Sequence, residues 1–351
     1  QGGLDAVVGK YDANGNPIWT RQLGSAGNDW GRAVAVDASG NVFVAGQTTG
    51  NLGAGTNSGL NDAFLAKYNA SGTLLWTKLI GTPGDDIANA VAVDSTGNVI
   101  VGGSTTGSLG FTNQGGIDAW INKYDTNGVF VYSRQLGTAG DDVAYGIAVD
   151  GSGNAYLAGS TTGNMPGGSN AGLNDVFLAQ YTSAGGRAWV SQWGTSGDDI
   201  ASAAAVDPSG NIFLSGSSTG AFGGTNAGGL DAWVKKVGSN GVQIWTRQLG
   251  TAGDEDAFGV ATDGAGNVYI SGDTTGALAG ASNGGPYDMY AAKYDTSGTQ
   301  VWVRQLGGSL NEVSKAVCTA PGAAYIVGGT FGSLGGANLG GKDIVIARYA
   351  Q

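Results

Sequence analysis

Pairs of adjacent polar residues, most of them acidic, recur in glycine-rich loops of this 351-residue chain and are the first candidates for chemistry. One such loop is GTAGDDVAYG, residues 137–146. The pairs are Asn28-Asp29, Asp85-Asp86, Asp141-Asp142, Asp198-Asp199, Asp254-Glu255 and Asn311-Glu312. Adjacent carboxylates could bind a metal ion, act as a general acid and base, or shape the turn that carries them.

Catalysis by these pairs is disfavoured because they repeat. A glycosidase needs two carboxylates in different surroundings, one of them with a raised pKa, and several equivalent copies do not provide that asymmetry. The chain also has no histidine, which excludes histidine-based triads, metal ligands and general bases. We therefore expect no catalytic residues and no enzymatic activity.

Calcium is the metal that such loops favour, because it takes oxygen ligands from carboxylates, amide side chains and backbone carbonyls. The candidate ligands are Asp29, Asp85, Asp86, Asp141, Asp142, Asp198, Asp199, Asp254, Glu255 and Glu312. In the other interpretation, the carboxylates accept backbone N–H bonds and cap their own turns. No DxDxDG run is present, so we expect turn capping first, with calcium as the alternative and no other cofactor.

Tryptophan suggests a second chemistry, the stacking of sugar rings. Trp30, Trp120, Trp193 and Trp233 stand outside the regular pattern of tryptophans and are the candidate ligand-binding platforms. The other tryptophans recur once per repeat, so we expect them to pack between neighbouring repeats. They are Trp19, Trp76, Trp189, Trp245 and Trp302, with Tyr132 in the same place once. The single cysteine, Cys318, is expected to be a small buried side chain.

The elements that must position these side chains repeat along the whole chain. The Asp that opens DAFLAKY and its copies recurs with spacings of 57, 56, 57, 56, 57 and 55 residues. These residues are Asp5, Asp62, Asp118, Asp175, Asp231, Asp288 and Asp343. Such spacing indicates one supersecondary unit of 56 or 57 residues copied about six times. We therefore expect a single domain over residues 1–351.

Each copy predicts four short antiparallel strands. In the first full copy they are residues 33–37, 42–46, 62–68 and 73–81, separated by turns such as NASG. Asn-Gly pairs in equivalent turns elsewhere are strong hairpin signals, and no stretch has helical periodicity. Four antiparallel strands repeated at this spacing predict an all-β fold, the β-propeller.

The number of predicted strands favours six blades. The strands sum to 25, one more than the 24 that six blades of four strands need. We expect the N-terminal hairpin (5–23) to join the last inner pair (315–329), which ties the N- and C-terminal strands together. One DxxxxKY strand, 5–11 or 343–349, is then surplus. It is either a fifth strand of the closing blade or a strand that pairs with a neighbouring molecule.

The repeated pattern resembles the SBBP-type bacterial β-propeller repeats. AVAVDSTGNVIVGGSTTG, DAFLAKYNASGTLLWTKLIG and their copies carry the resemblance, which covers residues 5–349. It implies a propeller in a secreted or cell-surface bacterial protein, often as one of several modules, and it implies no catalytic activity. The last copy departs from the pattern, because KAVCTAPGAAYIVGG has Ala320 where the other copies have Asp.

The composition of the chain excludes some classes of binding partner. The net charge is −11 with only 16 Lys and Arg, so the clustered basic residues that nucleic-acid binding needs are missing. No apolar run is long enough to form a membrane span. The chain begins QGGLD, which indicates a processed form or a segment of a longer protein.

Two functions remain. The first is a non-catalytic extracellular or cell-surface module with a structural or interaction role in adhesion, a surface layer or fibre assembly. Its partners would be other surface proteins, or copies of itself bound through the terminal strands. The alternative is a multivalent glycan-binding propeller, lectin-like and calcium-dependent, that uses long loops such as residues 47–61.

Overall fold

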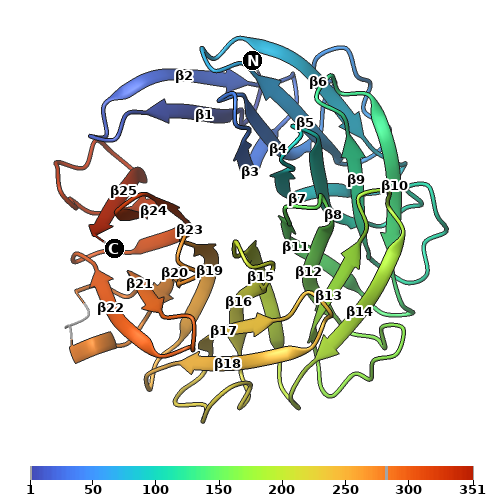
Figure 1. The fold of residues 1–351 in the computed structure, drawn as a ribbon. Coiled ribbons are helices and arrows are strands. Elements are labelled where there is room, and N and C mark those ends of the chain that lie inside the picture. The colour runs from blue at the N-terminus through green and yellow to red at the C-terminus, as the bar shows by residue number, and fades with distance from the viewer. Residues whose placement is uncertain (1, 281–283, 351) are drawn as a thin grey trace. The chain divides into compact units, whose positions relative to one another are not determined.

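The computed structural model describes residues 2–280 and 284–350, which form β-strands and one short 3-10 helix, η1 (Leu278–Gly280) (Figure 1). An N-terminal hairpin contains β1 (Ala6–Tyr11) and β2 (Pro17–Leu23). Two four-stranded sheets follow. They are β3 (Asp29–Val36), β4 (Val42–Thr48), β5 (Asp62–Tyr68) and β6 (Leu74–Ile80), then β7 (Asp86–Val93), β8 (Val99–Thr105), β9 (Asp118–Tyr124) and β10 (Phe130–Leu136).

The remaining strands continue the same order. The third sheet contains β11 (Asp142–Val149), β12 (Ala155–Thr161), β13 (Asp175–Tyr181) and β14 (Arg187–Trp193). The fourth contains β15 (Asp199–Val206), β16 (Ile212–Ser218), β17 (Asp231–Val237) and β18 (Gln243–Leu249). The fifth contains β19 (Glu255–Thr262), β20 (Val268–Thr274), β21 (Asp288–Tyr294) and β22 (Gln300–Leu306). A last sheet has three strands, β23 (Glu312–Ala320), β24 (Ala323–Thr330) and β25 (Asp343–Ala350).

The all-β, six-bladed propeller predicted from the repeats is confirmed, with 25 strands among the described residues. Five blades are four-stranded, and the sixth consists of β23, β24 and β25. β25 takes the third-strand place beside β24, so of the two strands expected to be surplus it is β1 that is not needed there. β25 reaches this edge through loop 331–342, and closing a loop of this length costs less entropy than bringing in a strand from the other end of the chain. The joining of the N-terminal hairpin to this blade stays a prediction. Among the described residues, β1 pairs with β2 alone.

Local hydrogen bonds explain the tight hairpins. Asp37 ends the first strand of its blade, and its Oδ1 accepts bonds from the backbone N–H groups of Ser39 and Asn41 at 2.9 and 2.8 Å. Gly40 completes the turn with a φ of 77°, a conformation that side chains with a Cβ disfavour. The Asp that opens each third strand accepts a hydrogen bond from the loop before the strand. Asp62 Oδ2 accepts the N–H of Ser58 and so holds down the long preceding loop.

Burial is highest in the two middle strands of each blade. Every residue of β4 and of β5 is buried, whereas the outer strand β6 and the inner strand β3 are only partly covered. Cys318 of β23 was expected inside, but it is exposed. Its neighbour Val317 faces the core, and successive residues of a strand point to opposite sides.

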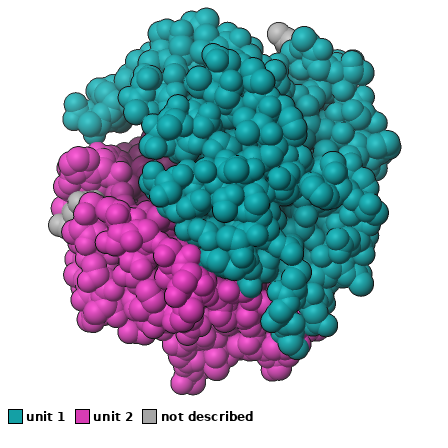
Figure 2. All heavy atoms as spheres, turned by 45° about the vertical axis from the view of Figure 1, so that its right-hand side comes forward, with its two compact units in different colours: residues 1–169, 179–190 teal, residues 170–178, 191–351 magenta. Residues whose placement is uncertain are grey.

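The chain divides into two compact units, shown in different colours in Figure 2. Unit 1 is residues 1–169 with 179–190, and unit 2 is residues 170–178 with 191–351, so the boundary runs within β13 and β14. In unit 1, Phe43, Val101 and Trp120 share a core cluster that joins successive blades. In unit 2, Phe213, Ile270 and Tyr290 do the same. A single domain over residues 1–351 stays a prediction.

No helix in residues 2–280 or 284–350 has the length and apolar character that crossing a membrane requires.

Candidate functional site

The second acid of each repeated pair is buried and ties three segments together. Asp86 is fully buried, and its Oδ2 accepts bonds from the backbone N–H and the hydroxyl of Thr82 at 2.5 and 2.8 Å. Its Oδ1 accepts the hydroxyl of Thr105 at the end of β8, at 2.5 Å. The same kind of bond to the residue four positions earlier is made by Asp29, Asp142, Asp199, Glu255 and Glu312.

The first residue of each pair points to a different partner. Asp141 Oδ1 accepts the backbone N–H of Ile117, and Asp254 Oδ1 accepts that of Leu230, at 3.1 and 3.0 Å. In three of the other pairs the first side chain accepts an N–H from the same loop position: Asn28 from the backbone of Leu4, and Asp85 and Asp198 from the side-chain amides of Asn61 and Asn174. These bonds fasten the long loop of one repeat to the start of the next first strand.

The two acids of a pair therefore serve separate structural bonds. Burial raises the pKa of Asp142, although hydrogen bonds from its neighbours oppose that shift. Within residues 2–280 and 284–350, no three Asp, Glu or Cys side chains come close enough together to hold a metal ion. Calcium binding by these loops stays a prediction.

The four candidate stacking rings are in different surroundings. Trp120 and Trp233 are 0% exposed, so no face of either ring is open to a sugar, which corrects their assignment as platforms. Trp120 Nε1 donates to the carbonyl of Ser104 at 3.0 Å, inside the blade. Trp193 is half-buried, and the Lys235 ammonium, whose pKa burial lowers to about 7, lies 5.0 Å from its ring centroid. Trp30 is also half-buried.

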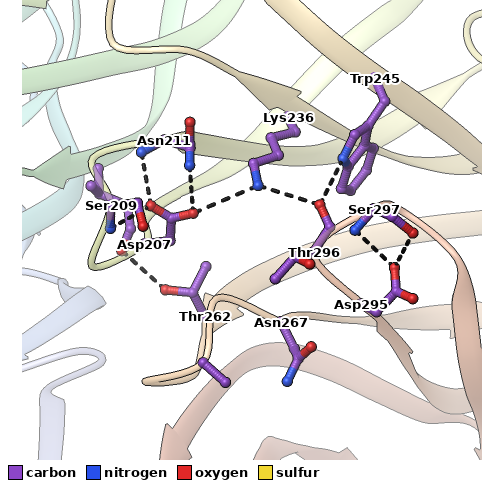
Figure 3. A network of polar contacts seen from close by, with 12 residues as sticks. Asp207, Ser209, Asn211, Lys236, Trp245, Thr262, Asn267, Asp295, Thr296 and Ser297 are labelled. Atoms are coloured by element: carbon purple, nitrogen blue, oxygen red, sulfur yellow. Dashed lines mark hydrogen bonds and ion pairs between the residues drawn. The ribbon is translucent and has the colours of Figure 1, made fainter.

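The recurring tryptophans pack against the next repeat, as expected. Trp245 Nε1 and Lys236 Nζ both donate to the carbonyl of Thr296, in the turn between the third and fourth strands of the next blade (Figure 3). Arg247 Nε donates to the carbonyl of Gly298 in the same turn, at 2.8 Å. We call such a Lys, Trp and Arg set a turn socket.

Equivalent turn sockets occur in unit 1. Lys10, Trp19 and Arg21 bind the turn at residues 69–72, through bonds of 3.2, 3.1 and 2.6 Å to its carbonyls. Each turn ends in a glycine with positive φ, and the ring of the socket leaves no room for a side chain there. A Cβ on Gly72 would lie 2.8 Å from Trp19, and a Cβ on Gly298 would lie 2.9 Å from Trp245.

The lysine of a turn socket also pairs with an Asp of its own blade. Lys123 Nζ lies 2.9 Å from Asp94 Oδ2, and Lys236 Nζ lies 3.8 Å from Asp207 Oδ2 (Figure 3). Burial opposes the charge of Asp94, but hydrogen bonds from Thr96, Asn98 and Lys123 outweigh it and hold its pKa at about 2. The repeated polar residues are thus part of the blade-to-blade structure.

The last turn socket differs from the others. It consists of Lys293, Trp302 and Arg304, here called the end socket, and no hairpin turn from the described residues of unit 2 is bound to it. Trp302 stacks on Tyr349 with centroids 5.9 Å apart, much as Trp19 stacks on Tyr68 at 6.4 Å. A cavity of about 380 Å³ lies over these residues.

Sequence reasoning missed the β-bulges of the first strands. In β3 the register passes from Gly31 to Ala33 and leaves Arg32 unpaired. The same shift leaves one residue unpaired in β7, β11, β15, β19 and β23. The six bulge residues are Arg32, Asn89, Tyr145, Ser202, Phe258 and Lys315. Bulges re-aim side chains and are frequent beside functional sites. The sequence does carry one sign of these bulges: the bulge position has a different residue in every copy, whereas the positions around it repeat.

Two bulge residues of unit 2, Phe258 and Lys315, lie near an unusual carboxyl group. Lys315 lies 4.6 Å from the ring centroid of Phe258. Nearby, Asp273 on β20 faces Asp256 on β19 and accepts the backbone N–H of Ser314 on the next blade at 2.5 Å. Burial raises the pKa of Asp273 to about 7, helped by the charge of Asp256 and opposed by the bond from Ser314 and by two lysines. No other copy has two acids at these positions.

Comparison with known proteins agrees with the repeat structure. A family model described as the SBBP β-propeller repeat matches residues 18–53, 75–110, 131–165 and 244–278. Each match runs from a fourth strand through the next two strands into the long loop.

Two curated proteins are similar in part. The regulatory protein FlaEY of Caulobacter vibrioides is 32% identical over 43% of this chain and 18% of its own length. An uncharacterized WD repeat-containing protein of Acanthamoeba polyphaga mimivirus is 24% identical over 90% of this chain and 31% of its own length. The chain thus spans less than a third of the length of either relative.

Two solved structures are similar over most of the chain. One is a protein of unknown function from Bacteroides caccae, with a TM-score of 0.47 and 11% identity over 87% of this chain and 91% of that one. The other is the β-propeller domain of the Trilobed protease from Pyrococcus furiosus, with a TM-score of 0.47 and 8% identity over 92% and 82%. On the strength of the four family matches and the strands that they cover, the chain carries the SBBP β-propeller repeat.

Proposed function

We propose that the chain is a non-catalytic interaction module, displayed outside the cell, that assembles with copies of itself through its terminal strands. Two complementary features support this proposal: among the described residues of unit 2 the end socket holds no turn, and among those of unit 1 no socket holds the turn of the N-terminal hairpin. The location outside the cell rests on the resemblance of the repeats to secreted and cell-surface propellers.

The N-terminal hairpin has the features that a turn socket binds. Its turn at residues 12–15 has the Asp-to-Gly pattern of the bound turn at residues 295–298, and Gly15 has a φ of 85°. A Cβ on Gly15 would have no atom within 4 Å, whereas the glycines of bound turns touch an aromatic ring. The hairpin therefore has a free glycine corner of the kind that fits beneath Trp302.

The sixth blade lacks the strand that the hairpin could supply. Among the described residues of unit 2, the blade of β23, β24 and β25 has no fourth strand, and β25 is covered on one face only. The sequence of β2, PIWTRQL, differs from the fourth strand β18, QIWTRQL, at its first residue alone. A strand edge without a partner is a template for pairing with another chain.

Contact between one copy's hairpin and the next copy's end socket is heterologous, so it leads to rings or to filaments. β1 and β25 both have the sequence of a third strand, and only one of them is needed beside β24. The arriving hairpin therefore either displaces β25 or pairs with it through β2 alone.

We expect no catalysis by the repeated side chains. Asp86, Asp141, Arg247 and Lys123 illustrate their use, because each is bonded to groups of its own or a neighbouring repeat and so serves the structure.

Sedimentation velocity over a range of protein concentrations tests the assembly. We expect the wild-type chain to form larger species as concentration rises. Gly15→Asn should remain monomeric, since Asn tolerates positive φ but its Cβ would collide with Trp302. Arg304→Ala should also remain monomeric, because it removes the group that would bind the turn carbonyl.

A matched control separates assembly from folding. Gly210 lies in a different kind of turn with a φ of 81° and open space around its Cβ, so Gly210→Asn should assemble like the wild-type chain. A wild-type chain that stays monomeric at every concentration would refute the assembly.

A further inference from the structure

Arg32 differs from Arg21 and Arg134, the arginines of unit 1 that bind turns. Arg21 and Arg134 each donate to the carbonyl of a turn in the next repeat. Arg32 stands instead at the bulge of β3, where its side chain is partly exposed. Its two Nη groups have no hydrogen-bond partner and no carboxylate partner among the described residues. It therefore presents a guanidinium edge that no group of the structure uses.

A chain of amide side chains holds Arg32 in one orientation. Arg32 Nε donates to Gln47 Oε1 at 2.8 Å. Gln47 Nε2 donates to Asn61 Oδ1 at 3.3 Å, and Asn61 Nδ2 donates to Asp85 Oδ1 at 2.6 Å. Support of this kind fixes a binding group before a ligand arrives, which lowers the entropy cost of recognition.

The bulge residues of the neighbouring blades add polar groups. Burial raises the pKa of Tyr145, and the Arg32 guanidinium lies close enough to oppose that rise. Asn89 Nδ2 donates to the carbonyl of Ala144 at 2.9 Å, which fixes the bulge of β7 against the strand that carries Tyr145. Partial burial lowers the pKa of Arg32, and a bound anion would relieve that cost.

We propose that Arg32 is the anchor of a binding site for a carboxylate-bearing sugar, a hexuronate unit of an acidic polysaccharide. A planar guanidinium with two free N–H groups matches a carboxylate through paired hydrogen bonds. The groups around it carry hydroxyl and amide functions, which suit the hydroxyls of a sugar ring. Tyr145 is the second contact residue, and Gln47 is the positioning residue.

The Nε–H signal of Arg32 in ¹⁵N-correlated NMR spectra provides the test, with sodium D-glucuronate as the probe. D-Glucose is the neutral control and sodium acetate is the control for a bare carboxylate. We expect glucuronate to shift the signal saturably, glucose to leave it in place, and acetate to bind more weakly than glucuronate. Equal responses to glucose and glucuronate, or acetate binding as tightly as glucuronate, would overturn the assignment.

Variants connect the binding to the named residues, with the Trp and backbone signals of each reporting glucuronate binding. Arg32→Gln should weaken binding by at least about tenfold, as expected for lost charge-assisted hydrogen bonds. Arg32→Lys should keep part of the affinity, and Tyr145→Phe should lose several-fold. Arg187→Gln removes an exposed arginine elsewhere and should bind like the wild-type chain. Unchanged affinity in Arg32→Gln would contradict the proposal, whatever the assembly state of the protein.

Discussion

For single residues, Asp94 and Asp273 respond to pH in opposite ways. Asp94 is held charged by hydrogen bonds, with a pKa of about 2. Asp273 is buried opposite Asp256, and its pKa is raised to about 7. A carboxyl group whose pKa is lowered on folding stabilises the folded state at pH values above its ordinary pKa. A carboxyl group whose pKa is raised on folding stabilises the folded state at pH values below that raised pKa.

The first prediction concerns Asp273. Between its ordinary pKa of 3.8 and about 7, the folded state keeps a proton that the unfolded state has lost. The free energy of unfolding should therefore be highest near pH 4 and fall by up to about 3–4 kcal/mol by pH 7. Urea denaturation of Asp273→Asn should show a much smaller fall. Lys235, with its lowered pKa of about 7, acts in the opposite direction but above pH 7.

One result of the urea denaturation would contradict this prediction. If the wild-type protein and Asp273→Asn lose the same free energy of unfolding between pH 4 and pH 7, Asp273 is not the group that titrates.

A second prediction concerns Asp94. Its stabilising effect is present above its ordinary pKa of 3.8 and is lost as the pH falls through about 2. Asp94→Asn should therefore lose less stability than the wild-type protein between pH 4 and pH 2, measured by thermal unfolding followed by circular dichroism. An acid-induced loss as steep as that of the wild-type protein would exclude this role.

For the strands and turns, the turn socket is the repeated contact between blades. Lys236, Trp245 and Arg247 hold the turn at residues 295–298 from three sides. Blade contacts of this nearest-neighbour kind make stability depend on each interface in a repeat protein. The glycine at the corner of the turn is the most sensitive position, because it needs both positive φ and an empty Cβ site.

The third prediction separates these two needs. Gly298→Ala should lower the free energy of unfolding by about 2–4 kcal/mol, since positive φ costs an L-residue about 1–2 kcal/mol and overpacking against Trp245 adds to it. Gly210 has a similar φ but open space around its Cβ position, so Gly210→Ala should lose only about 1–2 kcal/mol, the part that comes from positive φ. Urea denaturation measures both. Equal losses would mean that the socket does not constrain the corner.

For the molecule as a whole, the repeat was predictable and the exceptions to it were not. Regular spacing of Asp and Trp predicted the strands and the blades because each copy must bury the same faces. The bulge at Arg32 depends on register between strands, which spacing along the chain does not reveal. Likewise Trp120 and Trp233 differ from the regular tryptophans in position, but only the folded structure shows that they are buried.

The ends of the chain illustrate the same limit. Two third-strand copies, β1 and β25, could be recognised from sequence, yet the sequence alone did not decide which of them pairs with β24. That choice depends on the loop that leads to β25. Within the described residues of unit 2 it leaves no fourth strand beside β25 and no turn in the end socket, and the proposed assembly rests on these two features.

Mixing two blocked variants is the most direct test of that assembly. Gly15→Asn has an intact end socket and Arg304→Ala has an intact N-terminal turn, so each should be monomeric alone. Sedimentation velocity of an equimolar mixture should then show a species of two chains, because one partner supplies the turn and the other the socket. A mixture that sediments as the sum of its two separate components, while the wild-type chain assembles, would contradict the account.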